Sequence, residues 1–185
     1  MYTTTILATL FAALPALGAP TTRSAPSAFS GLSLRSGSAV QYASIDANGT
    51  YFKLGSGSST YCPSGISGID CSDYASDVTR FAGGNGTLAL DVVVPGGQQV
   101  YVDTNGALRF TQPHGSGLNG GSPTGFSFTA DGSSLLFNGA GFAACPYGTD
   151  DALHVYSTNH GVGEGCEDFI FYVVSNPGAQ AYEYE

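Results

Sequence analysis

The sequence predicts an all-β fold, a single-domain β-sandwich or partly closed barrel, with a β-trefoil as the alternative. Short runs of β-branched and aromatic residues recur between clusters of Gly, Asn and Asp, and no long window has the periodicity of an amphipathic helix. Asn-Gly and Asp-Gly pairs separate several of these runs, and both tolerate the positive φ angles of tight hairpins. The unequal spacing of the hairpins disfavours a propeller or a solenoid.

The chain begins with an uncharged apolar run that has the character of a secretory signal. This run is too short to span a bilayer and ends in small residues, so we expect residues 1–18 to be a signal peptide. Residues 19–38 are rich in Ser, Thr and Pro, and we expect them to form a disordered or O-glycosylated lead-in. Residues 39–185 then form a single β domain.

The β domain contains short segments whose composition is typical of strands. In chain order they are 40–46, 50–54, 87–94, 99–103, 107–111, 126–130, 134–138, 152–157 and 168–175. Tight turns separate three pairs of neighbouring segments. The turn residues are Asn48-Gly49, Asn105-Gly106 and Asp131-Gly132.

Four parts of the β domain allow more specific predictions about turns, strand order and loops. Asp46 and Asp103 precede turns, where a carboxylate commonly accepts backbone N–H groups. Residues 90–114 predict a three-strand meander. Residues 168–175 are apolar on both alternating faces, which predicts a central strand covered on both sides. Residues 112–125 contain no regular pattern and predict a long surface loop.

The charge balance excludes some classes of partner. The net charge is −9, with only five basic residues, scattered along the chain. Such a surface repels phosphate backbones and anionic lipids, so we expect no nucleic-acid partner. The polar, acidic C-terminal segment lacks the hydrophobic tail of a glycolipid signal, so we expect no membrane anchor.

Four cysteines and two sequons agree with export. Three disulfide pairings are possible, and we favour Cys62 with Cys71 and Cys145 with Cys166, because short loops close at the smallest entropic cost. A zinc site is disfavoured, since no Cys-x-x-Cys is present. The sequons at Asn48 and Asn85 predict N-glycosylation.

One segment contains the ligand types of a metal site. Imidazole and carboxylate groups bind zinc or copper, but the segment reads as a strand and a Gly-rich loop rather than a helix, so a disulfide-pinned acidic loop is the favoured interpretation and no metal or cofactor is predicted. The candidate ligands are His154, His160, Glu164, Glu167 and Asp168.

A hydrolase would need a nucleophile with a base, paired carboxylates or a metal ion. His114 adjoins the loop at 112–125, yet no Gly-x-Ser-x-Gly phrase supplies a nucleophile for it. A glycosidase needs two carboxylates across a cleft, and the dense acidic groups fall in predicted loops, at Asp150-Asp151 and at 164–168. The sequence therefore predicts no catalytic residue.

Carbohydrate binding is the stronger alternative, because secreted β domains often hold sugars on exposed aromatic rings. The chain has eleven Tyr and no Trp. We expect the tyrosines in predicted strands to pack in or beside the core and those outside the strands to be able to face solvent. The first group is Tyr42, Tyr51, Tyr101, Tyr156 and Tyr172, and the second is Tyr147, Tyr182 and Tyr184.

The stretch LDVVVPGGQQVYVDTNGALRFTQPH, residues 90–114, closely resembles the core phrase of the PhiA family of fungal cell-wall proteins. Three shorter phrases of that family occur in the same order along the chain. They are YFKLG from Tyr51, TYCP from Thr60 to Pro63 and GFAACP from Gly141 to Pro146. Together they span most of the chain that follows the predicted signal peptide.

The resemblance implies a secreted, wall-associated protein linked to phialide development and conidium formation, from a family also described as IgE-binding allergens. It brings no enzymatic activity or catalytic residue. The expected partners are cell-wall glycans or wall proteins, bound non-covalently. The alternatives from other classes are a secreted carbohydrate-binding module and a carbohydrate-active hydrolase such as a glycoside hydrolase.

Overall fold

Antiparallel strands dominate the computed structural model, which describes residues 26–74 and 76–185. The all-β class expected from the sequence is confirmed. Within these residues the helical segments are two short 3-10 turns, and no helix is long and apolar enough to cross a membrane. The predicted signal peptide, 1–18, lies outside the described residues.

The described strands alternate with tight turns and longer loops. The strands are β1 Ala28–Leu34, β2 Ile45–Asn48, β3 Tyr51–Leu54, β4 Thr60–Tyr61, β5 Phe81–Leu90, β6 Gln98–Val102, β7 Leu108–Phe110, β8 Thr124–Phe128, β9 Ser134–Phe137, β10 Phe142–Tyr147, β11 Asp150–Ser157, β12 Glu167–Ser175 and β13 Glu183–Tyr184. The 3-10 helices are η1 Cys71–Tyr74 and η2 Thr158–His160.

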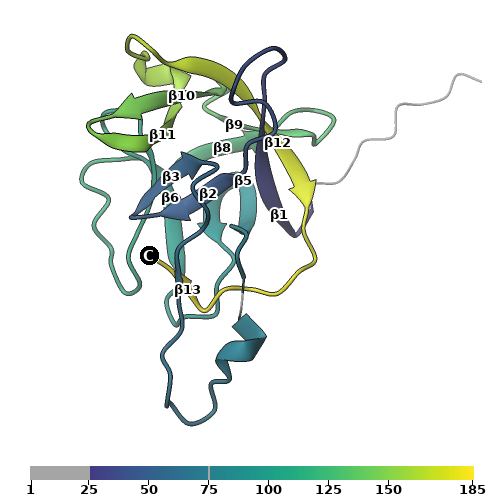
Figure 1. The fold of residues 1–185 in the computed structure, drawn as a ribbon, viewed down its shortest axis with the longest axis vertical. Coiled ribbons are helices and arrows are strands. Elements are labelled where there is room, and N and C mark those ends of the chain that lie inside the picture. Colours follow the sequence, from purple (N-terminus) through teal and green to yellow (C-terminus); the bar gives the residue numbers. More distant parts are fainter. Residues whose placement is uncertain (1–25, 75) are drawn as a thin grey trace, which may run out of the picture.

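The main sheet returns on itself. Its strands follow the path β1-β12-β10-β11-β3-β7-β6-β5-β8-β9, and the extra pairings β12–β9 and β1–β5 join distant parts of this path into a ring (Figure 1). β2 pairs with β3 beside the path, while β13 and β4 make a separate two-stranded sheet. Every pairing between these strands is antiparallel, which agrees with the many short hairpin turns of the sequence.

Phenylalanine side chains from distant strands fill the inside of this sheet. Phe81 on β5 stacks on Phe29 of β1 with 5.4 Å between ring centroids. It also lies 5.2 Å from Phe52 of β3 and 5.6 Å from Phe171 of β12. All four side chains are fully buried, so aromatic packing is a large part of what stabilises the fold.

Strand β1, Ala28–Leu34, contradicts the expectation of a disordered lead-in over 19–38 for the part that the structure describes, and 19–25 lie outside the described residues. It pairs along its length with β12, and alternate residues, Phe29, Gly31 and Ser33, are buried. The Ser33 hydroxyl donates to the carbonyl of Ala43 at 3.1 Å, which satisfies a polar group inside the sheet. The amino-acid composition suggested disorder because two of the three buried residues of β1, Gly31 and Ser33, are small or polar.

Gly31 is needed because β1 lies close to the aromatic core. A Cβ at this position would lie 2.5 Å from Cε1 of Phe171 and 2.9 Å from Cδ1 of Ile45. We therefore expect Gly31→Ala to lower the free energy of unfolding by about 1–3 kcal/mol, the usual cost of overpacking a core. Urea denaturation followed by circular dichroism measures this. The matched control is Gly141→Ala, whose new Cβ would meet only the Phe169 carbonyl oxygen, at 3.7 Å.

If Gly31→Ala and Gly141→Ala unfold at the same urea concentration, the close packing of β1 against β12 is not what constrains this position.

The pairing order of the meander predicted over 90–114 is confirmed, since β5 pairs with β6 and β6 with β7. The strand expected over 87–94 is wrong beyond Leu90, where β5 ends; the N–H groups of Val93 and Val94 donate to the C-terminal segment instead. Asp103 accepts the N–H of Thr104 at 2.7 Å, as expected of a carboxylate before a turn. The hairpin of β2 and β3 differs from the prediction, which placed its turn at Asn48-Gly49. Asn48 pairs with Tyr51, so the turn residues are Gly49 and Thr50, with φ angles of 65° and 67°.

Two strand predictions need correction. In the segment 40–46 a strand begins only at Ile45, after a single bridge between Ser44 and Leu32, and Tyr42, expected in or beside the core, is 69% exposed in a turn. The segment 168–175 is central as predicted, since β1, β10 and β9 all pair with β12. Its outer face is not covered, however, because Ile170 is 54% exposed. Apolar residues on the outer face of this strand produced the wrong expectation.

The C-terminal segment also differs from expectation. Tyr184, expected to be able to face solvent, is fully buried. The side chain of Gln98 accepts the N–H of Tyr184 and donates to its carbonyl, each at 2.8 Å. The tail is polar apart from two tyrosines, Tyr182 and Tyr184, and lacks a longer apolar pattern that would indicate which of them is buried.

The structure pairs the cysteines as favoured, Cys62 with Cys71 and Cys145 with Cys166. The second disulfide joins β10 to the loop before β12. Of the two sequon residues, Asn85 is exposed on β5, while Asn48 is half-buried and donates from Nδ2 to the carbonyl of Gly57 at 3.2 Å. Glycosylation at both stays a prediction.

Candidate functional site

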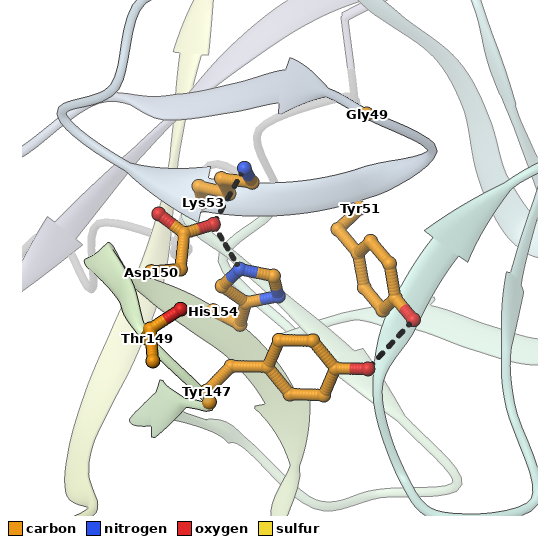
Figure 2. Close-up of a pocket in the computed structure, with 8 residues that line it drawn as sticks. Gly49, Tyr51, Lys53, Tyr147, Thr149, Asp150 and His154 are labelled. Atoms are coloured by element: carbon orange, nitrogen blue, oxygen red, sulfur yellow. Dashed lines mark hydrogen bonds and ion pairs between the residues drawn. The ribbon is translucent and has the colours of Figure 1, made fainter.

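An open pocket of about 480 Å³ lies where β3 passes the hairpin of β10 and β11 (Figure 2). We call it the Tyr147 pocket. Its lining residues are Gly49, Tyr51, Lys53, Tyr147, Gly148, Thr149, Asp150 and His154.

Strand register brings these residues together. His154 on β11 pairs with Lys53 on β3. At the end of the hairpin Tyr147 pairs with Asp150, after a register shift between Cys145 and Tyr147. Such a shift re-aims side chains at the end of a strand. Residues close to one another in the hairpin thus meet a strand that lies about a hundred positions earlier in the sequence.

Asp150 is the centre of the charged part of the pocket. Its Oδ2 accepts the ammonium of Lys53 at 2.7 Å and lies 2.9 Å from Nε2 of His154, and its Oδ1 accepts the N–H of Ala152 at 3.1 Å. The hydrogen bond with His154, and then that with Lys53, hold the pKa of Asp150 well below its ordinary value. The carboxylate therefore stays ionised, and its contribution to stability is lost only as the pH falls through that lowered pKa.

The aromatic part of the pocket is built on His154. The ring of Tyr147 stacks on the imidazole with 4.6 Å between centroids and 25° between planes, and Tyr51 lies 4.9 Å from it. The two tyrosine hydroxyls are 3.3 Å apart, and this contact, together with burial, raises the pKa of Tyr51 (Figure 2). His154 is buried, whereas Tyr147 is 41% exposed.

Arg109, on the neighbouring strand β7, fixes the ring of Tyr51. Its guanidinium lies 4.3 Å from the ring centroid of Tyr51, a cation–π distance. The same guanidinium donates to Oδ2 of Asp103 at 3.0 Å and to Oγ1 of Thr50 at 3.1 Å. With Tyr51 held in this way, Tyr147 is the more accessible aromatic surface of the pocket.

This arrangement suits binding better than acid–base chemistry. An exposed ring beside a few fixed polar groups is a common design for small-molecule and sugar sites. Glycoside hydrolysis needs a second carboxylate, but among the described residues that line the pocket Asp150 is the single carboxylate, and it already has three partners. No group of three or more His, Cys, Asp or Glu able to hold a metal ion occurs within 26–74 and 76–185.

The structure does not bring together the residues that the sequence suggested as metal ligands. His154 contacts Asp150, whereas His160 lies in η2 against Gly106. Glu164 lines another pocket, beside the Cys145–Cys166 disulfide. Glu167 accepts the hydroxyl of Ser38. The remaining candidate, Asp168, is exposed on β12, where its backbone carbonyl accepts Nη1 of Arg35 at 2.5 Å.

His114 lies away from the Tyr147 pocket. It is exposed in the loop after β7, has a φ of 59°, and its Nδ1 would be 3.7 Å from a Cβ built on Gly96. This places it beside the turn between β5 and β6. Asp151, the other acidic candidate of the hairpin, is exposed and does not line the pocket.

Sequence reasoning missed part of this site. The sequence predicts Tyr51 in or beside the core, indicates no role for Lys53, and places His154 and Asp150 in one acidic, His-containing segment without indicating that these two pair with each other. One available signal was the single basic residue in the otherwise apolar phrase YFKL, because a lysine inside a short strand needs an anionic partner or solvent.

Comparisons with known proteins identify the family of this chain and one relative. A family model described as PhiA-like secreted protein matches residues 29–185. An "Uncharacterized secreted protein" of Arthroderma benhamiae is 37% identical over 109 residues, which cover 55% of this chain and 53% of that relative. The chain thus spans about half the length of the curated relative that it matches. No solved structure matches the chain.

Proposed function

Since the chain belongs to the family of PhiA-like secreted proteins, we propose that it is a secreted, non-enzymatic protein of the fungal cell wall. It is held there by non-covalent contacts with wall glycans or wall proteins, and the glycan contact is made at the Tyr147 pocket. The observation that carries the proposal is the exposed ring of Tyr147, stacked on a buried imidazole and flanked by the Lys53–Asp150 ion pair.

The pocket is suited to binding because its parts are already ordered. The imidazole of His154 is 2% exposed and is fixed by Asp150, so the ring stacked on it has a firm support. A ligand therefore has few side chains to immobilise, which reduces the entropic cost of binding. The face of a pyranose ring packs on an aromatic ring while its hydroxyls reach the adjacent polar groups.

The absence of enzymatic activity is part of the proposal. It is supported by the engagement of Asp150 with Lys53, His154 and a backbone N–H, which opposes both proton transfer and nucleophilic attack by this carboxylate. The wall-binding experiment should therefore include an assay for sugar release.

A role in phialide and conidium development is the most specific part of the proposal. Family membership supports it. A deletion strain is expected to make fewer conidia, and complementation with Tyr147→Ala shows whether the pocket contributes to that role. Normal conidiation in the deletion strain would contradict the proposed developmental role. The proposed wall binding would then depend on the wall-binding experiment alone.

Tyr147→Ala is expected to weaken binding to washed, protein-free fungal walls roughly tenfold, a change of about 1.4 kcal/mol. The reason is loss of the stacking surface. Sedimentation of the protein with the walls measures this, with thermal unfolding as a check that the fold persists. Tyr42→Ala is the matched control, because Tyr42 is 69% exposed and does not line the pocket.

Equal sedimentation of wild type, Tyr147→Ala and Tyr42→Ala would contradict the assignment of the binding site to this pocket. Sugar release by the wild type that disappears in Asp150→Asn would show that the protein is an enzyme.

A further inference from the structure

A second open pocket, of about 200 Å³, lies on the other side of β3 from the hairpin of β10 and β11. We call it the Gln112 pocket. It combines residues of β6 and β7 with the loop that follows β7. Its lining residues are Thr50, Tyr101, Arg109, Phe110, Thr111, Gln112, Gly115, Gly117 and Asn119.

The two pockets share a wall. Tyr51, which lines the Tyr147 pocket, pairs in register with Arg109, which lines the Gln112 pocket. The guanidinium lies 4.3 Å from the tyrosine ring centroid, and Thr50 bonds to the same guanidinium while lining the second pocket. In the sheet the order is β11, β3, β7, β6, so the pockets follow one another across neighbouring strands.

The charges around both pockets are paired with one another. Lys53 bonds to Asp150 at 2.7 Å, and Arg109 bonds to Asp103 at 3.0 Å. A phosphate, sulfate or uronate ligand would have to compete with these carboxylates for its cations, and the net charge of the chain opposes its approach. The pairing favours an uncharged ligand.

The Gln112 pocket offers uncharged polar groups instead. The side chains of Gln112 and Asn119 are exposed, and neither has a hydrogen-bond partner in the part of the chain that the structure describes. Carboxamides both donate and accept, so they complement sugar hydroxyls, which do the same.

We propose that the two pockets are adjacent subsites of one groove, which binds an uncharged polysaccharide chain lying across β11, β3 and β7. Sugar units stack on Tyr147 in the first subsite, pass the Tyr51–Arg109 pair and meet the amides of Gln112 and Asn119 in the second. This inference rests on the proposed glycan binding. It adds that the glycan is uncharged and that it must be long enough to reach both subsites.

Calorimetry with oligosaccharides of different length tests the groove. The probes are laminaribiose and laminarihexaose, with chitobiose and chitohexaose as a second uncharged pair. For one pair at least, the hexaose is expected to bind roughly tenfold more tightly than the biose, the effect of about 1.4 kcal/mol from added hydrogen bonds. Polygalacturonate, a carboxylated polymer, is expected to bind more weakly than the hexaose of that pair.

The double variant Gln112→Ala/Asn119→Gly is expected to lose most of the gain from length and to bind the biose as the wild type does. Gly is chosen at 119 because the native φ is 48°. Ser116→Ala, an exposed change in the same loop outside the lining, is the matched control and should keep the gain.

The failures of the two proposals are distinguishable. A length gain that survives in the double variant, or that never occurs, overturns the second subsite while wall binding through Tyr147 can still hold. Polygalacturonate binding as tight as that of the uncharged hexaose overturns the charge class. Wall binding that is unaffected by Tyr147→Ala overturns the proposed site itself.

Discussion

Replacing Tyr184 with alanine is expected to lower the free energy of unfolding by about 3–5 kcal/mol, the range for removing a buried aromatic side chain. The side chain is fully buried, and its hydroxyl accepts the N–H of Arg80 and donates to the carbonyl of Val78, each at 3.0 Å. Removing it leaves a cavity and two unpartnered backbone groups. Urea denaturation followed by circular dichroism measures the change.

The control Tyr184→Phe separates packing from hydrogen bonding. It keeps the ring and is expected to cost about 1–3 kcal/mol. Burial raises the pKa of Tyr184 above its ordinary 10.0, so the unfolded chain ionises at a lower pH than the folded one. The stability that the neutral, buried hydroxyl of Tyr184 contributes is therefore complete below pH 10 and is lost as the pH rises through the folded-state pKa. The loss of stability with rising pH should be smaller in Tyr184→Phe, and an alanine variant as stable as the wild type would contradict the burial of this residue.

Replacing Asp91 with alanine is expected to cost about 3–5 kcal/mol, the usual penalty for leaving one member of a buried ion pair alone. Arg80 and Asp91 form a 2.8 Å ion pair in which their side chains are 7% and 15% exposed. Two further nitrogens of Arg80, Nε and Nη1, are buried without a hydrogen-bond partner within the described residues. The guanidinium therefore depends heavily on this carboxylate.

The comparison variant is Arg80→Met, which removes the buried cation and keeps an apolar side chain of similar length. It is expected to destabilise less than Asp91→Ala, because a carboxylate that is 15% exposed and also accepts Nε2 of Gln180 keeps one partner and some contact with water. Adding Arg80→Met to Asp91→Ala should restore part of the lost stability. Thermal unfolding of the three variants measures this, and additive losses would show that the two side chains act independently.

The sequence predicted strands where local pattern and local burial agree. The meander of β5, β6 and β7 was predicted because alternating apolar residues lie between turns formed by Gly and Asn. β1 was missed because Gly31 and Ser33 occupy buried positions that are normally apolar, and only Phe171, far away in the sequence, explains why a small residue is required. β10 was missed for a similar reason, since Ala143 and Ala144 carry little strand signal yet are fully buried.

The candidate site was harder to predict from the sequence than the strands, because it depends on the register in which the strands pair. Tyr147 was expected to be able to face solvent, and it is exposed. That it lies over His154 depends on the register shift at the end of β10, and that Lys53 reaches Asp150 depends on the pairing of β3 with β11. The register shift leaves no pattern of apolar residues in the chain, and the pairing of β3 with β11 joins segments about a hundred residues apart.

The pairing of β1 with β12 also determines when the sheet can be completed. Phe29 finds its cross-strand partner at Ser175, close to the far end of the described chain. A topology rich in such non-local contacts has a high contact order and folds in about milliseconds to seconds, slower than a helical domain of similar size. During secretion the ring cannot close until β12 has emerged, so the apolar inner faces of the earlier strands stay exposed to chaperones and to aggregation for most of translocation.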